Sequence, residues 1–112
     1  MAALNATLVT TVGGRADIAA AATAAAAGGD TAPVGPGVFL VVINGGAASR
    51  TVTIATPGTV VGHAVADATL VVPAGKTGII PLTNLFRGAT DRAAITYDAV
   101  TSVTVAVFTL GA

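Results

Sequence analysis

The chain has 112 residues, of which 54% are hydrophobic and only 9% are charged, whereas about 25% of the residues of an ordinary soluble domain are charged. Five basic residues balance five aspartates, and this neutral charge without a basic cluster argues against nucleic acid as a partner. No apolar run approaches the ~20 residues that span a bilayer, so we expect no membrane insertion. The hydrophobic surface is instead expected to be buried against other protein.

The N-terminal third contains one strand candidate and one alanine-rich segment. Thr7–Val12 has high β propensity and ends at a Gly-Gly pair. Over Ala19–Ala27 two conformations compete, because alanine is the best helix former and Asp17 could cap a helix. A helix of alanines would bury only methyl groups, however, and its neighbours are strands. We therefore expect an extended, alanine-rich arm within an N-terminal region of residues 1–36.

The arm leads through a connector into the predicted centre of the domain. Asp30–Gly37 holds two prolines and two glycines, which predicts a connector without regular structure. Val38–Ile43 is a continuous β-branched and aromatic run, typical of a central strand covered on both faces. After an Asn-Gly-Gly turn, Arg50–Thr56 alternates, with Val52 and Ile54 on a buried face and threonines on a wet one. The two strands are predicted to form a hairpin.

Two further hairpins are predicted toward the C-terminus. Thr69–Val72 and Lys76–Ile80 flank a Pro-Ala-Gly turn, and Ala94–Asp98 and Ser102–Leu110 flank an Ala-Val-Thr turn. The last strand is apolar on both sides, so we expect it to be buried on both faces. Residues 37–112 thus predict an all-β core. The chain is expected to form a single antiparallel β-sandwich of seven to eight short strands, either a jelly roll or immunoglobulin-like.

No residue pattern indicates catalysis, and we expect the protein not to be an enzyme. A catalytic triad would have to combine the sole histidine, His63, with Ser49 or Ser102. Neither serine lies in a G-x-S-x-G nucleophile motif. Cysteine is absent and the aspartates are scattered, so we expect neither a metal site nor a cofactor. One tyrosine and three phenylalanines offer little material for an aromatic platform that binds sugars or bases.

Four phrases carry a family resemblance: AAAAGGDTAP (24–33), FLVVINGGAASRTVTIATPGTVVGHAVAD (39–67), TLVVPAGKTGIIPL (69–82) and ITYDAVTSVTVAVF (95–108). In combination they resemble small proteins encoded by tailed phages of actinobacteria and by related prophages, found beside the major capsid protein and regarded as capsid decoration or minor capsid proteins. The resemblance covers most of the chain. It departs at residues 78–82, where Gly-Ile-Ile-Pro-Leu stands in place of the family's Gly-Pro-Phe-Pro phrase.

The resemblance implies a structural virion protein, made in the host cytoplasm, that binds the outer surface of a capsid and stabilises it. Its partners would be the major capsid protein and its own copies, as a homo-oligomer such as a trimer. The alternative is a β-sandwich module of a phage fibre or surface protein that recognises a host glycan or receptor. We expect the protein contacts on the N-terminal segment and on the loop that follows the second predicted hairpin. The candidate interface residues are Leu4, Leu8, Ile18, Leu85, Phe86 and Arg87.

Overall fold

The computed structural model of the protein describes residues 2–9, 22–56, 59–60, 63–64, 67–83, 86–88 and 92–110. These ranges contain twelve strands and no α-helix. The alanine-rich segment is accordingly non-helical in its described part, residues 22–27, as predicted. In chain order the strands are β1 (Ala2–Ala3), β2 (Ala6–Val9), β3 (Thr23–Ala24), β4 (Asp30–Pro33), β5 (Val38–Asn44), β6 (Arg50–Ile54), β7 (Thr59–Val60), β8 (His63–Ala64), β9 (Ala68–Val72), β10 (Thr77–Pro81), β11 (Arg92–Tyr97) and β12 (Val103–Leu110).

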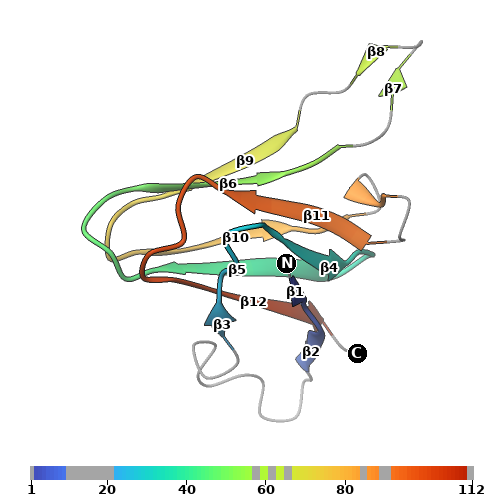
Figure 1. The fold of residues 1–112 in the computed structure, drawn as a ribbon. Helices are drawn as coiled ribbons and strands as arrows, with labels where there is room; N and C mark the ends of the chain where they lie inside the picture. The colour runs from blue at the N-terminus through green and yellow to red at the C-terminus, as the bar shows by residue number, and fades with distance from the viewer. Residues whose placement is uncertain are drawn as a thin grey trace.

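Two sheets pack face to face (Figure 1). The first sheet has the strand order β1-β4-β11-β6-β9. The second has the order β10-β5-β12-β2, with β3 also paired to β12. Strands β7 and β8 pair with each other in the connection between β6 and β9. The predicted β-sandwich is confirmed.

The strand pairing is that of a jelly roll. Of the eight strands β3, β4, β5, β6, β9, β10, β11 and β12, the first pairs with the last, the second with the seventh, the third with the sixth and the fourth with the fifth, all antiparallel. This nested pairing is what results when one long antiparallel ribbon is rolled into two sheets. Of the two architectures that the sequence left open, the pairing selects the jelly roll. Strands β1 and β2 are additions, each parallel to its neighbour.

The three predicted hairpins are wrong, because each of these turns crosses from one sheet to the other. Strand β5 pairs with β10 and β12, whereas β6 pairs with β9 and β11. The same holds for β9 with β10 and for β11 with β12. In an arch of this kind, the apolar side chains of consecutive strands face each other across the core. In a hairpin they would lie side by side in one sheet, and a second layer would have to come from elsewhere.

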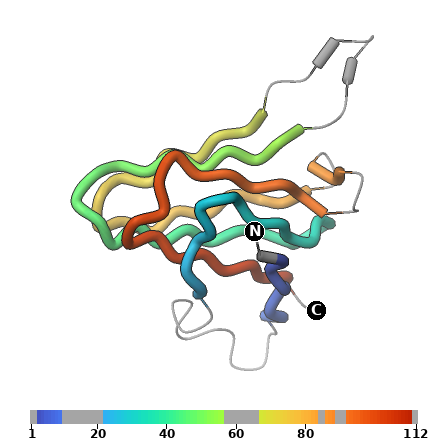
Figure 2. The backbone as a smooth tube through the Cα atoms, in the orientation of Figure 1, coloured from blue at the N-terminus to red at the C-terminus, as the bar shows by residue number. Residues whose placement is uncertain are grey.

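The three arches gather at one end of the sandwich, on the left of Figure 2. Buried Asn44 links two of them. Its Nδ2 donates to the backbone carbonyls of Ala48 at 2.8 Å and of Val72 at 3.0 Å. Its backbone N–H donates to the backbone carbonyl of Lys76 at 3.0 Å. The N–H of Gly45 donates to the carbonyl of Ser102 in the third arch at 2.9 Å. These bonds satisfy buried polar groups at the sheet ends.

The predicted connector Asp30–Gly37 is also partly wrong, since residues 30–33 form strand β4 between β1 and β11. Pro33 is tolerated because of where its missing N–H would point. The carbonyl of Thr31 accepts from the N–H of Leu4, so the backbone groups of Thr31 and Pro33 face the β1 side. Strand β1 ends opposite Thr31, and the proline therefore removes no hydrogen bond from the sheet.

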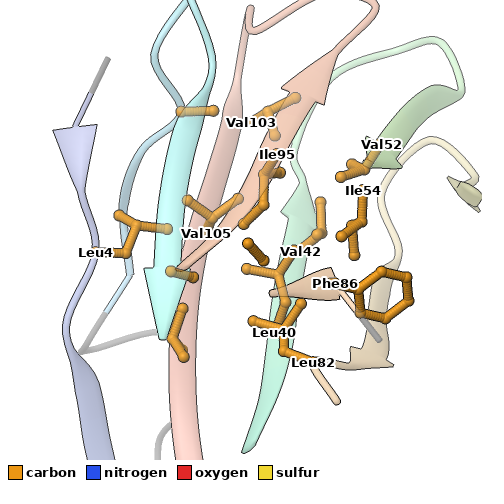
Figure 3. Close-up of a cluster of buried hydrophobic side chains, with 14 of the residues drawn as sticks. Leu4, Leu40, Val42, Val52, Ile54, Leu82, Phe86, Ile95, Val103 and Val105 are labelled. Carbon is orange, nitrogen blue, oxygen red and sulfur yellow. The ribbon is translucent and has the colours of Figure 1, made fainter. Parts of the chain in front are cut away.

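The core fills the space between the sheets and confirms the predicted faces of three strands. Val52 and Ile54 are fully buried, as expected for the inner side of β6. Strands β5 and β12 are buried on both faces, because Val41, Ala106 and Phe108 form a second apolar cluster on the outer face of the second sheet. The rings of Phe39 and Phe108 pack there in a tilted arrangement, with centroids 5.7 Å apart. Figure 3 shows the main cluster, which includes Leu4, Leu40, Val42, Val52, Ile54, Leu82, Phe86, Ile95, Val103 and Val105.

Candidate functional site

One lateral side of the sandwich ends in two strands that have no further neighbour among the described strands. In the first sheet β9 pairs only with β6, and in the second sheet β10 pairs only with β5. Residues 73–76 join these two strands. We call Ala68–Val72 together with Thr77–Pro81 the open edge. An edge of this kind presents backbone N–H and C=O groups to which another chain can add a strand.

The backbone groups that β10 presents can be identified from its bonds to β5. The carbonyl of Lys76 accepts from the N–H of Asn44, and the N–H of Leu82 donates to the carbonyl of Val38. Because backbone direction alternates along a strand, even-numbered residues of β10 face β5 and odd-numbered ones face outward. Thr77 and Ile79 thus present both an N–H and a C=O, whereas Pro81 presents only a C=O.

The same reasoning applies to β9. The N–H of Ala55 donates to the carbonyl of Ala94, and the carbonyl of Thr51 accepts from the N–H of Asp98. The odd-numbered residues of β6 therefore face β11 and the even-numbered ones face β9. Since Val52 is paired with Leu70, the even-numbered residues of β9 face β6. The residues with outward-facing groups are Thr69 and Val71.

The open edge is apolar as well as unpaired. The side chains of Val71 and Ile79 are 58% and 62% exposed, and neither strand contains a charged residue. Natural proteins protect exposed edges with lysines, prolines, bulges or short strands. Of these devices the open edge has only Pro81, at the end of β10. This combination makes it a candidate contact surface for protein.

Close packing of the two sheets seals the core behind the open edge. A Cβ on Gly78 would lie 3.2 Å from Val72 Cγ2 and 3.4 Å from Leu70 Cδ2. Gly78 thus faces inward between these two side chains and lies opposite Val71. Ile79 is the next residue, so Val71 and Ile79 lie at nearly the same level on the outer faces of the two sheets.

The opposite side, which we call the closed edge, is finished by residues 2–9 together with β3 and β4. Leu4 is buried in the main cluster, and its N–H donates to the carbonyl of Thr31 at 2.7 Å. The guanidinium of Arg92 donates to the carbonyl of Leu4, to the carbonyl of Thr31 at 3.1 Å and to Thr31 Oγ1 at 3.1 Å. These bonds tie the N-terminal segment to both β4 and β11.

A buried acid lies near the closed edge. Asp30 is fully buried, and its Oδ2 accepts from the hydroxyl of Tyr97 at 2.7 Å and from the N–H of Ala26 at 3.3 Å. Burial raises the pKa of Tyr97 above its ordinary value of 10.0, and the hydrogen bond and negative charge of Asp30 raise it further. A carboxylate with no exposed surface cannot reach a substrate. The pair therefore supports the fold by tying the turn at residues 26–30 to β11.

A groove of about 440 Å³ lies where β2 and β3 both pair with β12. It is lined by Ala3, Leu4, Asn5, Thr7, Thr23, Ala24, Val105, Ala106 and Val107. No titratable side chain is among them, so the groove offers space without reactive groups. Within the described ranges, no three acidic or histidine side chains come close enough to hold a metal ion. In the same ranges no helix is both long and apolar enough to cross a bilayer.

The structure separates the six candidate interface residues. Leu4 and Phe86 are buried in the main cluster, at opposite sides of it in Figure 3. The prediction that these two residues are surface contacts is wrong, because both side chains fill the space between the sheets. Leu8 is 59% exposed and Arg87 is exposed, so both remain candidates. Ile18 and Leu85 lie outside the described residues.

The open edge was missed in the sequence, because two neighbouring strands without a charged residue are not typical of a sheet edge. Comparison of the chain with protein-family models, with curated proteins and with solved structures finds no match. The candidate site therefore rests on its geometry.

Proposed function

We propose that the protein is a structural virion component that decorates the outside of a tailed-phage capsid, binding the major capsid protein and its own copies. The resemblance of the four sequence phrases to capsid decoration proteins supports the proposal. The open edge is the observation in the structure that supports the proposal best, because a protein whose work is adhesion needs contact strands and no reactive group. Its uncharged β strands also carry little desolvation penalty when another chain covers them.

The expected energetics suit a protein present in many copies. A standard interface buries about 1,600 Å² in total, and its apolar part contributes about 25 cal/mol per Å² before the costs of association are subtracted. One small contact would hold a single copy weakly. Repetition over a shell adds avidity without new contacts for each copy.

The jelly-roll fold supports this role only by analogy, since viral capsid proteins, lectins and cupins share it. The alternative of a glycan-binding module lacks a supporting feature. All four aromatic residues lie in the described part of the chain, and none of them is exposed. Phe86 and Phe108 are buried in the two apolar clusters, and Tyr97 is bonded to Asp30.

The test is co-sedimentation of the purified protein with capsids assembled from the neighbouring major capsid protein. We expect saturable binding at a fixed ratio to capsid subunits, and no sedimentation of the protein alone. Replacing exposed Leu8 by Asp should weaken binding while the domain stays folded, whereas Lys76→Ala in an arch is the matched exposed control. Absence of binding to intact shells would reject the capsid role and direct the search to glycans and receptors.

A further inference from the structure

We propose that the open edge is a contact between two copies of this chain, related by a two-fold axis that extends both sheets across the dimer. The occupant of the edge is thus a second copy, with β10 paired to β10 and β9 to β9. This inference goes beyond the proposed function, because it concerns association in solution without a shell.

The hydrogen-bonding groups of β10 are complementary to themselves. With the axis at Ile79, the N–H and C=O of Ile79 in each copy face those of Ile79 in the other and form a pair of bonds. The same register places Thr77 opposite Pro81. The N–H of Thr77 in one copy can donate to the Pro81 carbonyl of the other. Because proline has no N–H, the Thr77 carbonyl is the one group of this ladder that gains no bond. The Ile79 side chains, both exposed, then cover each other on the outer face.

The same axis serves β9. A two-fold axis that pairs edge strands antiparallel is perpendicular to the sheets, so it passes through both layers of the sandwich. Gly78 packs between Leu70 and Val72, which places Val71 beside the line through Ile79. The most exposed aliphatic side chain of each edge strand therefore lies near the axis and can meet its own copy.

Charge and closure favour a second copy over an open chain of copies. The edge carries no charge and the whole chain is neutral, so two identical edges meet without repulsion. A two-fold contact closes at two subunits, whereas a head-to-tail contact would continue into a fibre. The two strands contribute ten residues, against about 20–30 per side in a standard interface. The dimer is therefore expected to be weak and concentration-dependent.

The first test compares two double variants by sedimentation equilibrium over a wide concentration range. Val71→Lys with Ile79→Lys places four positive charges near the axis of the dimer and should leave only monomer. Leu8→Lys with Leu110→Lys is the matched control, because these side chains are 59% and 60% exposed but lie away from the open edge. The control should dimerise like the unmodified chain, and circular dichroism should show both variants folded.

The second test captures weak contacts covalently. The chain has no cysteine, so Ile79→Cys introduces a single thiol. Residues facing each other in a hydrogen-bonded antiparallel pair have Cα atoms about 5.5 Å apart, within disulfide range. Diamide, itself reduced, would take two electrons and two protons from the two thiols and leave a disulfide-linked dimer. Leu110→Cys should cross-link far more slowly.

Three results would overturn the inference: monomer at every concentration, equal cross-linking of the two cysteine variants, or an oligomer that the edge lysines do not dissociate. No capsid is present in either test. A chain that dimerises but does not bind shells would reject the proposed function alone, and a monomer that binds shells would reject this inference alone.

Discussion

The two lateral sides of the sandwich are finished in different ways. At the closed edge the outermost strands are shorter, with two residues in β1, four in β2 and two in β3, and Arg92 holds the N-terminal segment to β4. At the open edge two five-residue strands end their sheets without cover from any described strand. A short edge strand offers few groups to another chain, whereas a long, uncharged one offers a full ladder. The open edge therefore offers the longer ladder of backbone groups in both sheets.

The two sides also seal the core by different means. At the closed edge the N-terminal segment inserts Leu4 between the sheets, and the part-buried Asp30–Tyr97 hydrogen bond joins β4 to β11. At the open edge the sheets approach so closely that a Cβ on Gly78 would lie 3.2 Å from Val72 Cγ2 and 3.4 Å from Leu70 Cδ2. The closed edge thus depends on contacts between residues far apart in sequence. The open edge depends on small side-chain volume.

Both sides of the sandwich pack on the same core, so a substitution in that core should lower the stability most. Replacing Val52 by Asp places a charge without a partner in a fully buried site, which should cost more than about 4 kcal/mol. Because a domain of this size is stable by only about 5–15 kcal/mol, urea unfolding should show that the variant has lost a large part of its stability. Thr53→Asp, on the outer face of the same strand, is the control and should stay folded. Equal stability of the two would contradict the assigned faces of β6.

The next largest loss of stability is expected at one of two glycines with positive φ, which lie near different edges of the sandwich. Gly29 has φ of 93°, and a Cβ there would lie 2.6 Å from the carbonyl oxygen of Ile95, whereas at Gly75, with φ of 72°, nothing lies within 4 Å. Gly75→Ala should cost about 1 kcal/mol for the left-handed backbone alone. Gly29→Ala adds the clash and should cost about 3 kcal/mol. Urea unfolding measures both, and equal values would show that the turn at residues 26–30 can move away from β11.

A smaller effect compares two leucines of the N-terminal segment. Leu4→Ala removes a side chain from the main cluster and should lower the free energy of unfolding by about 2 kcal/mol. Leu8→Ala, at an exposed site in the same segment, should change it by less than about 0.5 kcal/mol. If neither variant changes the free energy of unfolding, the N-terminal segment does not contribute to the closed edge.

The smallest effect concerns the part-buried hydrogen bond. Tyr97→Phe leaves Asp30 with one partner fewer and should cost about 1 kcal/mol. Because folding raises the pKa of Tyr97, the folded state favours the neutral phenol. That stabilisation is fully present below the unfolded pKa of 10.0 and is lost as the pH rises above it.

The single tyrosine and the absence of tryptophan make this titration easy to follow. Ultraviolet absorbance of the phenolate should appear only well above the ordinary tyrosine pKa in the folded protein, and at that pKa in urea. The Phe variant should lose the alkaline fall in stability that this group causes. Phenolate formation at the ordinary pKa in the folded protein would show that Tyr97 is not buried against Asp30.

Much of the fold was readable from local patterns. Alternation placed Val52 and Ile54 inside, because side chains of a strand point to opposite faces in turn. The uninterrupted apolar run of Val38–Ile43 and the mostly apolar sequence of β12 predicted strands buried on both faces. Pairing was not readable, because an arch and a hairpin have the same local signature of two strands around a short turn. Which of them forms depends on partners that lie elsewhere in the chain.

The candidate site was less predictable. Leu4 and Phe86 are apolar residues in segments that looked peripheral, and only the packing of the two sheets shows that both fill the core. Conversely, Val71 and Ile79 belong to strands that looked like the two halves of one hairpin. Neither could be recognised as an edge residue before the strand order was known.

The sequence by itself determined that this is a net-neutral, all-β protein with few charged residues, where its main strands lie and which of their side chains point inward. These properties follow from composition and from a two-residue period, and both are local. Only the tertiary structure decided that the turns are arches, that Asp30–Pro33 is a strand and that β9 and β10 end their sheets. Hydrogen-bond partners in a sheet are chosen between distant segments, and that choice settles which strands are left with an edge to share.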